Sequence, residues 1–487
     1  MDAGVQARTI TTQVPARLDR LPWSRFHWRV VIGLGGVWIL DGLEVTMVGN
    51  VAARLTEHGS GITITDAQIG VAAAIYIAGA CIGALFFGQL TDRFGRKKLF
   101  MVTLALYLVA TVATAFAFAP WYFYLARFFT GAGIGGEYAA INSAVDELIP
   151  ARVRGRVDLA INGSYWLGAA GGAVAALLFL DQSIFATDIG WRLAFGMGAI
   201  FGLMVLVVRR SIPESPRWLF IHGREDEAER IVDGIEQRVQ AETNEPLDNA
   251  EGSLKVRQRK TIPFREIAAV AFSRYPRRAV LGLALFIGQA FLYNGVTFNL
   301  GTLLKGFYDV SSSAVPLFFV VWALSNFAGP LILGKLFDTV GRKRMIAASY
   351  LGSAAVAAVL AWVFVSDAGG VWGFMSVLLV CFFLASAGAS SAYLTVSEIF
   401  PMETRALAIA FFFAVGTAIG GITGPLLFSR MVNTGDRHLM LWSFVASAVV
   451  MAFAGVVELL VGVNAEQKPL EDIALPMTAD ESTGSTP

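Results

Sequence analysis

The chain is poor in cysteine and in charged residues, and each deficit excludes a class of function. Only two of its 487 residues are cysteine, and Cys81 and Cys381 each lie inside an apolar run. This placement predicts small apolar side chains, and neither a disulfide framework nor a metal site. Only 15% of the residues are charged and the net charge is +1, whereas nucleic-acid-binding proteins concentrate a large basic excess. No nucleic-acid partner is therefore expected.

The sequence also lacks the motifs of an enzyme. It contains no metal-spaced histidine or cysteine cluster, no serine in a nucleophile elbow and no phosphate-binding loop. The four histidines, His27, His58, His222 and His438, fall near the ends of apolar runs or in loops, which argues against a histidine proton relay. We therefore expect no catalytic residue, no metal ion and no cofactor.

The first residues do not follow the pattern of a cleavable signal peptide. Such a peptide has a basic start, a short apolar core and a small-residue cleavage site. The first 28 residues are instead polar and carry four arginines, at positions 8, 17, 20 and 25. The amino terminus is therefore expected to stay in the cytoplasm.

Apolar residues are abundant. They make up 55% of the chain, against roughly 45–50% in an average soluble domain. A helix needs about 20 mainly apolar residues to cross a bilayer. Twelve such stretches occur, at approximately 30–52, 69–90, 99–119, 121–145, 157–180, 191–208, 279–304, 314–336, 345–365, 372–396, 407–428 and 439–461. The chain is therefore predicted to be an all-α membrane protein with twelve transmembrane helices.

The twelve spans fall into two groups of six. The polar segment 209–278 separates them, and its run of mixed charges at 224–230 predicts a solvent-facing helix. We expect a six-helix bundle with a cytoplasmic amino terminus at 1–208 and a cytoplasmic linker with short helices at 209–278. A second six-helix bundle at 279–463 and a cytoplasmic, disordered tail at 464–487 complete the chain.

Lysine and arginine in the loops predict the orientation, because these residues are retained on the cytoplasmic side. The even-numbered loops carry almost all of the loop lysines and arginines, for example near positions 93–98, 152–156 and 342–344, whereas the odd loops offer little, chiefly Arg54, Lys305, Arg430 and Arg437. Both termini and the linker are therefore expected in the cytoplasm, as an even number of spans requires. The predicted location is the inner, or plasma, membrane.

A repeated phrase links the two halves. Gly88, Asp92 and Gly95 follow span two, and Gly334, Asp338 and Gly341 follow span eight with the same spacing and with basic residues beyond. Glycine allows close helix packing and tight turns, and aspartate can cap a helix or pair with a basic group. A second echo places a glutamate before a proline and an arginine after it, at 147–154 and again at 398–405.

The sequence resembles the major facilitator superfamily along nearly its whole length. That architecture consists of two six-helix repeats related by pseudo-symmetry, with solute bound near the membrane midplane. The segment Pro213-Glu-Ser-Pro-Arg-Trp-Leu219 and the acidic phrase at 462–473 are similar to those of the sugar porter and metabolite:proton symporter branch. The resemblance implies a cytoplasmic gating network formed by Gly88, Asp92, Arg93, Gly95, Arg96, Glu147, Arg154, Glu214, Arg217, Asp338, Gly341, Arg342, Glu398 and Arg405.

Acidic residues within the spans are candidates for proton coupling. An ionisable side chain deep in a membrane is costly unless it is paired or hydrated. Asp41 and Glu44 lie three apart in span one, on one helical face, and Glu137 lies in a glycine-rich part of span four. By resemblance to sugar porters, Glu44 pairs with Arg127. A fixed ion pair that only sets helix register is the alternative reading.

Span seven offers candidate solute ligands. Gln289, Tyr293, Asn294 and Asn299 interrupt an otherwise apolar stretch, and sugar porters place amide ligands for hydroxyl groups there. The usual pair of glutamines and pair of tyrosines are incomplete, which puts a hexose in doubt. Further candidates for stacking and hydrogen bonding are Trp322, Asn326 and Tyr393.

Together these features predict a secondary active transporter. We expect proton-coupled uptake of a small polar organic solute, such as a sugar, an organic or aromatic acid or a related metabolite, by alternating access. Proton-driven efflux is the alternative, although span five lacks the glycine-proline phrase frequent in drug exporters. A transport-derived sensor is a further alternative. The expected partners are the solute and membrane lipid, and the chain is expected to act as a monomer.

Overall fold

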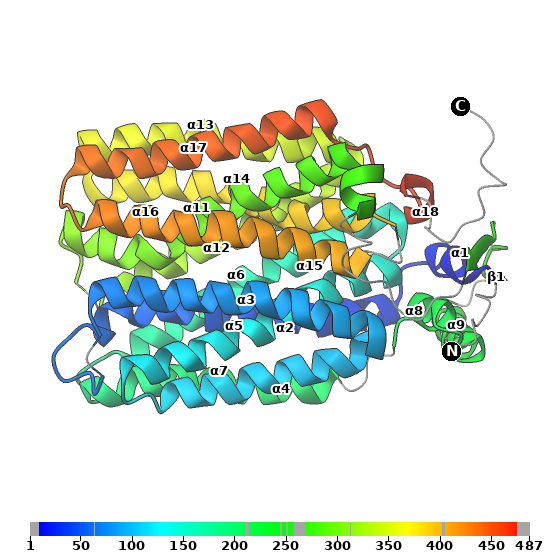
Figure 1. The fold of residues 1–487 in the computed structure, drawn as a ribbon, viewed down its shortest axis with the longest axis horizontal. Helices are drawn as coiled ribbons and strands as arrows, with labels where there is room; N and C mark the ends of the chain where they lie inside the picture. Colours follow the sequence, from blue (N-terminus) through cyan, green and yellow to red (C-terminus); the bar gives the residue numbers. More distant parts are fainter. Residues whose placement is uncertain are drawn as a thin grey trace.

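The computed structural model describes residues 9–62, 64–209, 214–243, 246–249, 252–257, 269–311, 313–401 and 405–474. Long, roughly parallel helices make up the body of the molecule, and a small cap of short elements covers one end (Figure 1). The cap contains residues 9–20 and the described parts of the linker. It marks the end that the charge distribution predicts to be cytoplasmic.

The first half contains six long helices: α2 (Arg25–Leu55), α3 (Asp66–Phe94), α4 (Arg96–Ala115), α5 (Pro120–Leu148), α6 (Arg154–Phe179) and α7 (Thr187–Arg209). A short 3-10 turn, η1 (Ala151–Val153), precedes α6. Side-chain caps fix where several helices begin. Thr65 accepts a hydrogen bond from the backbone amide of Gln68 at 3.3 Å, at the start of α3. These helices correspond to the first six predicted spans.

The second half contains α11 (Pro276–Tyr308), α12 (Val315–Thr339), α13 (Arg342–Ser366), α14 (Gly370–Ile399), α15 (Arg405–Gly416), α16 (Ile422–Val432) and α17 (Arg437–Val461). A π-helical segment, η3 (Thr417–Gly421), joins α15 to α16, and another, η2 (Val270–Arg274), precedes α11. The eleventh predicted span is therefore a helix with an interruption. Glycines at 416, 420 and 424 bring it close to the backbone of α11.

Ten of the described helical runs are long and apolar enough to cross a membrane. They include every long helix named above except α5 and α6, with α15 to α16 counted as one run. These two are also of membrane length, but they are richer in glycine and polar side chains. The structure therefore contains twelve membrane-length runs within the described residues, in the order that the sequence predicts.

The two halves form two layers that meet along the length of the bundle. Figure 1 shows the first-half helices below and the second-half helices above, with α6 and α15 between them. The main contacts across the boundary join α12 to α6 and α15 to α3. Gly88 of α3 lies against Ala410, and Gly334 of α12 lies against the backbone of Arg156. The repeated glycines therefore mark equivalent contacts between the halves.

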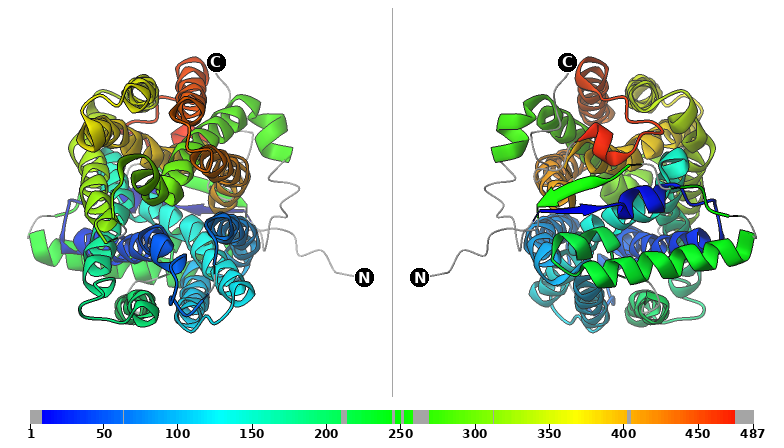
Figure 2. Two further views of the ribbon diagram at one scale, coloured as in Figure 1. Left: turned by 90° about the vertical axis from the view of Figure 1, so that its left-hand side faces the viewer. Right: turned by 90° about the vertical axis from the view of Figure 1, so that its right-hand side faces the viewer.

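The cap joins the first described residues of the chain to the described parts of the linker. Strand β1 (Thr9–Thr12) pairs antiparallel with β2 (Leu254–Arg257), and α1 (Val14–Asp19) packs on α9 (Glu225–Thr243), which follows α8 (Pro216–Ile221) (Figure 2). Arg17 pairs with Glu229 and Asp233 of α9, each at 2.5 Å, and with Glu236. The acidic side chains of the predicted solvent-facing helix α9 thus pair with Arg17, and its apolar face is buried.

The tail differs in part from the expectation. Residues 464–474, predicted to be disordered, contain the short helix α18 (Leu470–Ile473) and contact the bundle. Arg278 donates a hydrogen bond to the carbonyl oxygen of Ile473 at 3.0 Å. Leu470 and Ile473 are buried, and burial of these apolar side chains explains why the segment is ordered. Residues 475–487 lie outside the described part of the chain.

Candidate functional site

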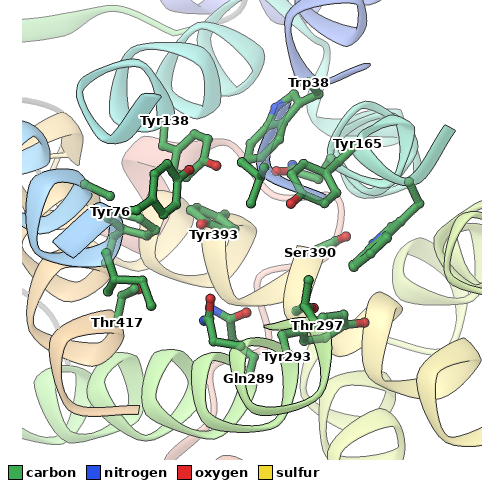
Figure 3. A pocket seen from close by; sticks show the side chains of 18 residues that line it. Trp38, Tyr76, Tyr138, Tyr165, Gln289, Tyr293, Thr297, Ser390, Tyr393 and Thr417 are labelled. Atoms are coloured by element: carbon green, nitrogen blue, oxygen red, sulfur yellow. The ribbon is translucent and has the colours of Figure 1, made fainter. Parts of the chain in front are cut away.

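A cavity of about 140 Å³ lies between the two halves near the middle of the long helices. Its walls come from α2, α3, α5 and α6 on one side and from α11, α14, α15 and η3 on the other. Aromatic side chains dominate it: Trp38, Tyr76, Tyr138, Tyr165, Trp166, Tyr293, Tyr393 and Phe413. Most of them surround the open centre in Figure 3. The site is therefore built for contact with a flat apolar face.

The aromatic rings hold one another in place across the boundary. Trp38 stacks on Tyr138 with ring centroids 4.7 Å apart and an interplanar angle of 13°. Tyr393, from the second half, meets both rings edge-on, at 5.9 and 6.0 Å. Trp166 of α6 lies 5.3 Å from Tyr293 of α11. Such pairs favour defined relative orientations, so a ring entering the cavity meets preformed faces.

The polar groups on the cavity wall are uncharged. Gln289 lines the cavity, and no hydrogen bond joins its amide to another described residue. Its side chain points towards the open centre in Figure 3. Asn294 is partly committed, because it donates to the carbonyl oxygen of Ala290 at 2.9 Å. Other polar groups on the wall are Asn162, Thr297, Ser390 and Thr417. Gln289 is thus an amide available to a bound solute.

The candidate ligands predicted from the sequence separate into three groups. Gln289, Tyr293, Asn294 and Tyr393 line the central cavity. Asn299 lies farther along α11 and lines a different cavity.

Trp322 and Asn326 do not line the central cavity but lie behind its wall. The Tyr293 hydroxyl donates to Asn326 Oδ1 at 2.8 Å, and Trp322 meets Trp166 edge-on at 4.9 Å. Both are wholly buried. Asn326 and Trp322 therefore position Tyr293 and Trp166, whose ring faces line the central cavity.

Most of the aromatic wall was not predicted. Trp38 lies one turn before Asp41, Tyr138 follows Glu137, and Tyr165 and Trp166 form a pair in span five. Each stands beside a residue that drew attention for another reason. Large amphipathic rings in otherwise apolar spans are a weak signal, because such rings also serve packing. Only the convergence of several helices separates the two roles.

The acidic candidates of span one have different surroundings. Glu44 and Arg127 form a buried ion pair, with Arg127 Nη1 donating to Glu44 Oε1 at 2.6 Å. The guanidinium group also lies over the ring of Tyr76 at 4.9 Å and near Phe195 at 5.6 Å. This is the pair that the resemblance to sugar porters implies. Arg127 is thereby committed to one carboxylate.

Asp41 has no such partner. It is fully buried, and neither carboxyl oxygen accepts a hydrogen bond from any described residue. Trp38 and Val45, one turn before and one turn after it on α2, both line the central cavity. Asp41 therefore lies on the cavity-facing side of its helix. Glu137 is also buried, in α5 beside Tyr138, but it does not line the cavity.

At the end of the bundle that carries the cap, Asp338 joins the two halves. Its carboxylate accepts hydrogen bonds from the backbone amides of Gly155 at 3.1 Å and Arg156 at 2.8 Å. These amides lie at the start of α6, where a helix favours negative charge. The sequence predicted that this aspartate caps the following helix or pairs with a basic group. Asp338 does pair with Arg342, and the helix that it caps is α6 of the other half.

Arg342 anchors Asp338 from the same side. It pairs with Asp338 at 2.8 Å and forms two hydrogen bonds to Glu398, each at 3.0 Å. Its backbone amide donates to Glu466 at 3.3 Å, and Gln467 donates to the carbonyl oxygen of Asp338 at 2.7 Å. The acidic tail phrase therefore belongs to the same cluster.

The remaining gating candidates lie at this end but have separate contacts. Glu214 accepts from the backbone amide of Lys97 at 3.1 Å, beside Gly95. Gly95 and Gly341 have φ values of 95° and 116°, which only glycine adopts easily. Arg154 pairs with Asp19 of the cap at 3.3 Å.

Two arginines complete the described gating candidates. Arg405 donates to the carbonyl oxygen of Ser397 at 2.5 Å, and Arg93 is exposed. The side chains of four further candidates, Asp92, Arg96, Glu147 and Arg217, lie outside the described part of the structure.

Comparisons with known proteins agree with this architecture. A protein-family model described as "Sugar (and other) transporter" matches residues 41–475. The niacin transporter NiaP of Acinetobacter baylyi is 31% identical over 466 residues, covering 94% of this chain and 99% of the relative. The 4-hydroxybenzoate transporter PcaK of Pseudomonas putida is 25% identical, covering 91% and 95%. Among solved structures, the major facilitator superfamily proton:xylose symporter XylE bound to 6-bromo-6-deoxy-D-glucose has a TM-score of 0.74 at 20% identity, covering 92% and 98%.

Proposed function

Because this chain belongs to the family of sugar and other transporters and has the major facilitator fold, we propose that it carries a small monocyclic aromatic metabolite together with a proton. It is a multi-pass membrane transporter and not an enzyme. The observation that carries the choice of solute is the aromatic wall of the central cavity. The choice of coupling ion depends on Asp41.

The size and lining of the cavity favour a single flat ring. Its volume, about 140 Å³, is close to that of an engineered protein cavity of about 150 Å³ that binds benzene. Eight aromatic side chains line it, and its polar groups are the amides of three residues and the hydroxyl groups of tyrosines, threonines and a serine. A sugar carries a hydroxyl group on most of its carbon atoms and needs a polar partner for each buried one. The wall offers ring faces more readily than such partners.

The charge balance around α2 favours Asp41 as the proton-binding group. Asp41, Glu44 and Arg127 would carry two negative charges and one positive charge if all were ionised. Glu44 takes the positive charge at 2.6 Å, which leaves Asp41 unpaired in a buried place. A buried, unpaired charge costs roughly several kcal/mol. Binding a proton removes that cost, whereas protonation of Glu44 would leave Arg127 without its ion pair.

Coupling follows from the position of Asp41 beside the cavity. A carboxylate solute in the cavity would be repelled by an ionised Asp41 on the adjoining helix face, because charges interact strongly where water is scarce. Solute and proton therefore enter together, or the proton enters first. A proton gradient directed inward then drives uptake.

The closed cytoplasmic end supports alternating access. Asp338 of the second half binds the start of α6 in the first half, so this contact must break before the cavity opens inward. We propose that residues 1–208 and 279–463 move as two units linked by 209–278. The lysine and arginine distribution supports cytoplasmic termini in the inner membrane.

Reconstituted vesicles provide the test. Radiolabelled niacin, 4-hydroxybenzoate and xylose are offered to proteoliposomes that are alkaline inside, with and without a protonophore. We expect the two aromatic acids to accumulate only while the pH gradient lasts. Accumulation of xylose but of neither aromatic acid would contradict the choice of solute. Accumulation that the protonophore leaves unchanged would contradict proton coupling, and gradient-driven loss of preloaded solute would indicate efflux.

A further inference from the structure

A second cavity, of about 380 Å³, lies at the end of the helices opposite to the cytoplasmic cap. It lies between the halves, because Ile69 and Gly70 of α3 face residues of α11 and α16 across it. On the proposed topology it faces the outside of the cell. Its polar wall includes Asn299, Thr302, Ser429 and Asn433.

Lys305 is the charged residue of this outer cavity. It lies in the last turn of α11, its side chain is exposed, and it lines the cavity. It forms no ion pair within the described part of the chain, and no acidic residue lines the cavity there. The ammonium group therefore gives the outer cavity an uncompensated positive charge, beside hydroxyl and amide groups that can complete the hydrogen bonding of an anion.

Helix α11 connects the outer cavity to the central one. Gln289, Tyr293 and Thr297 line the central cavity at helical spacing, and the next residue, Phe298, lines the outer cavity. Thr302 and Lys305 continue along the same helix to its end. Helix α11 thus carries polar groups that line the aromatic cavity and polar groups that line the outer cavity, and Lys305 lies near its outer end.

From this arrangement we infer that the outer cavity is a recognition site for the carboxylate group of the solute, with Lys305 as its cation. The central cavity offers rings and uncharged polar groups but no cation on its wall. Selection of an anionic solute over its neutral analogue therefore takes place at Lys305, before the solute moves along α11. This inference rests on the proposed function, since it assigns a charge to the proposed aromatic solute.

A lysine at the end of a membrane helix often extends towards lipid headgroups. Lys305 is placed differently, because the cavity that it lines lies between the two halves and not on the lipid-facing surface. Both a solute carboxylate and a lipid phosphate are anions, and the experiment separates them. A lipid contact would affect all solutes alike, whereas a recognition site affects only the anionic one.

The test compares niacin, an anion at neutral pH, with nicotinamide, a neutral molecule with the same ring. Initial uptake rates are measured in proteoliposomes for the parent, Lys305→Gln and Lys305→Arg at low and high ionic strength. Arg430→Gln is the matched control. Arg430 is an exposed cation in the last turn of α16, and it does not line the cavity. The two-solute comparison also controls for expression and folding.

We expect Lys305→Gln to raise the KM for niacin about fivefold, the size of one charge interaction at about 4 Å in water, with kcat unchanged. The KM for nicotinamide should not change, Lys305→Arg should restore the parent value for niacin, and about 1 M salt should remove the difference. An unchanged niacin KM in Lys305→Gln, an equal change for both solutes, or the same effect in Arg430→Gln would overturn the inference alone. A parent protein that carries neither compound would overturn the proposed function, and the inference with it.

Discussion

Replacing Asp41 by asparagine should separate solute exchange from accumulation. The amide has nearly the shape of the protonated acid, so the aromatic cavity beside α2 should still bind and release solute. It cannot bind and release a proton. The Glu44–Arg127 pair, 2.6 Å apart in the parent, should stay intact in this variant, so the local charge balance should become neutral and fixed.

The charge balance gives the magnitude of the loss. If Asp41 alone changes protonation, each cycle moves one proton, and a monocarboxylate moves with it without net charge. One pH unit is worth 1.36 kcal/mol per proton, a factor of about ten. The parent should therefore accumulate solute about tenfold per pH unit, independently of membrane potential. Asp41→Asn should reach an inside-to-outside ratio of about one.

The assay uses proteoliposomes with the membrane potential clamped by a potassium ionophore. Counterflow of labelled against unlabelled solute measures exchange, and net uptake under an imposed pH gradient measures accumulation. Glu44→Gln is the informative companion. Glu44→Gln frees Arg127 to pair with Asp41, which lies three residues before Glu44 on the same helix face, so this variant should also abolish accumulation. It should also be less stable, because breaking a buried ion pair destabilises a protein by roughly 3–5 kcal/mol.

The reasoning is wrong if Asp41→Asn accumulates solute as the parent does at equal expression. Equal accumulation by Asp41→Asn, Glu44→Gln and the double variant would remove proton coupling from α2 altogether. Glu137 would then be the next residue to replace. Loss of both exchange and accumulation in Asp41→Asn would show that the carboxyl group contributes to binding itself.

Three further predictions concern packing, gating and the cap. Gly42→Val should destabilise the protein by about 1–3 kcal/mol and lower its melting temperature in detergent, because a β-carbon there would overlap a backbone carbonyl of α6; Gly36→Ala, with nothing within 4 Å of the new carbon, should not. Asp338→Asn should slow turnover severalfold with little change in solute Kd, since charge-assisted hydrogen bonds contribute about 1.5–3 kcal/mol each. Turnover equal to that of the parent, measured with equal amounts of solute-binding protein, would refute this prediction. Burial raises the pKa of Glu236, but hydrogen bonds from Arg17 and a neighbouring arginine outweigh it and hold the pKa below its ordinary value. The contribution of Glu236 to the stability of the cap should therefore be fully present above about pH 4.3 and be lost as the pH falls through the lowered pKa. The loss should appear as faster amide hydrogen exchange in residues 9–20, after correction for the intrinsic effect of pH on exchange. Corrected exchange rates that do not change on acidification would contradict this prediction.

The sequence predicted the fold because the bilayer imposes a strict length and composition on each helix. Twelve apolar stretches, their even number and the loop cations follow from that constraint. Two glycine-aspartate-glycine phrases, ending at Gly95 and Gly341, then indicated the family. The partner of Asp338 could not be read in the same way, because it lies on α6 of the other half, more than 180 residues away. A capping aspartate in sequence does not reveal which helix it caps.

The cavity was decided by tertiary structure alone. Gln289 and Tyr293 stood out as polar residues in an apolar span, but the wall also needs Trp38, Tyr138 and Trp166 from three other helices. In sequence, an aromatic residue that lines a cavity and one that fills a core look the same, since both follow the same helical spacing. The same limit applies to Asp41: its position in a membrane span was visible, whereas its lack of a partner followed from where Arg127 points. Periodicity along one chain determines which residues face inward, and only the meeting of helices determines what they face.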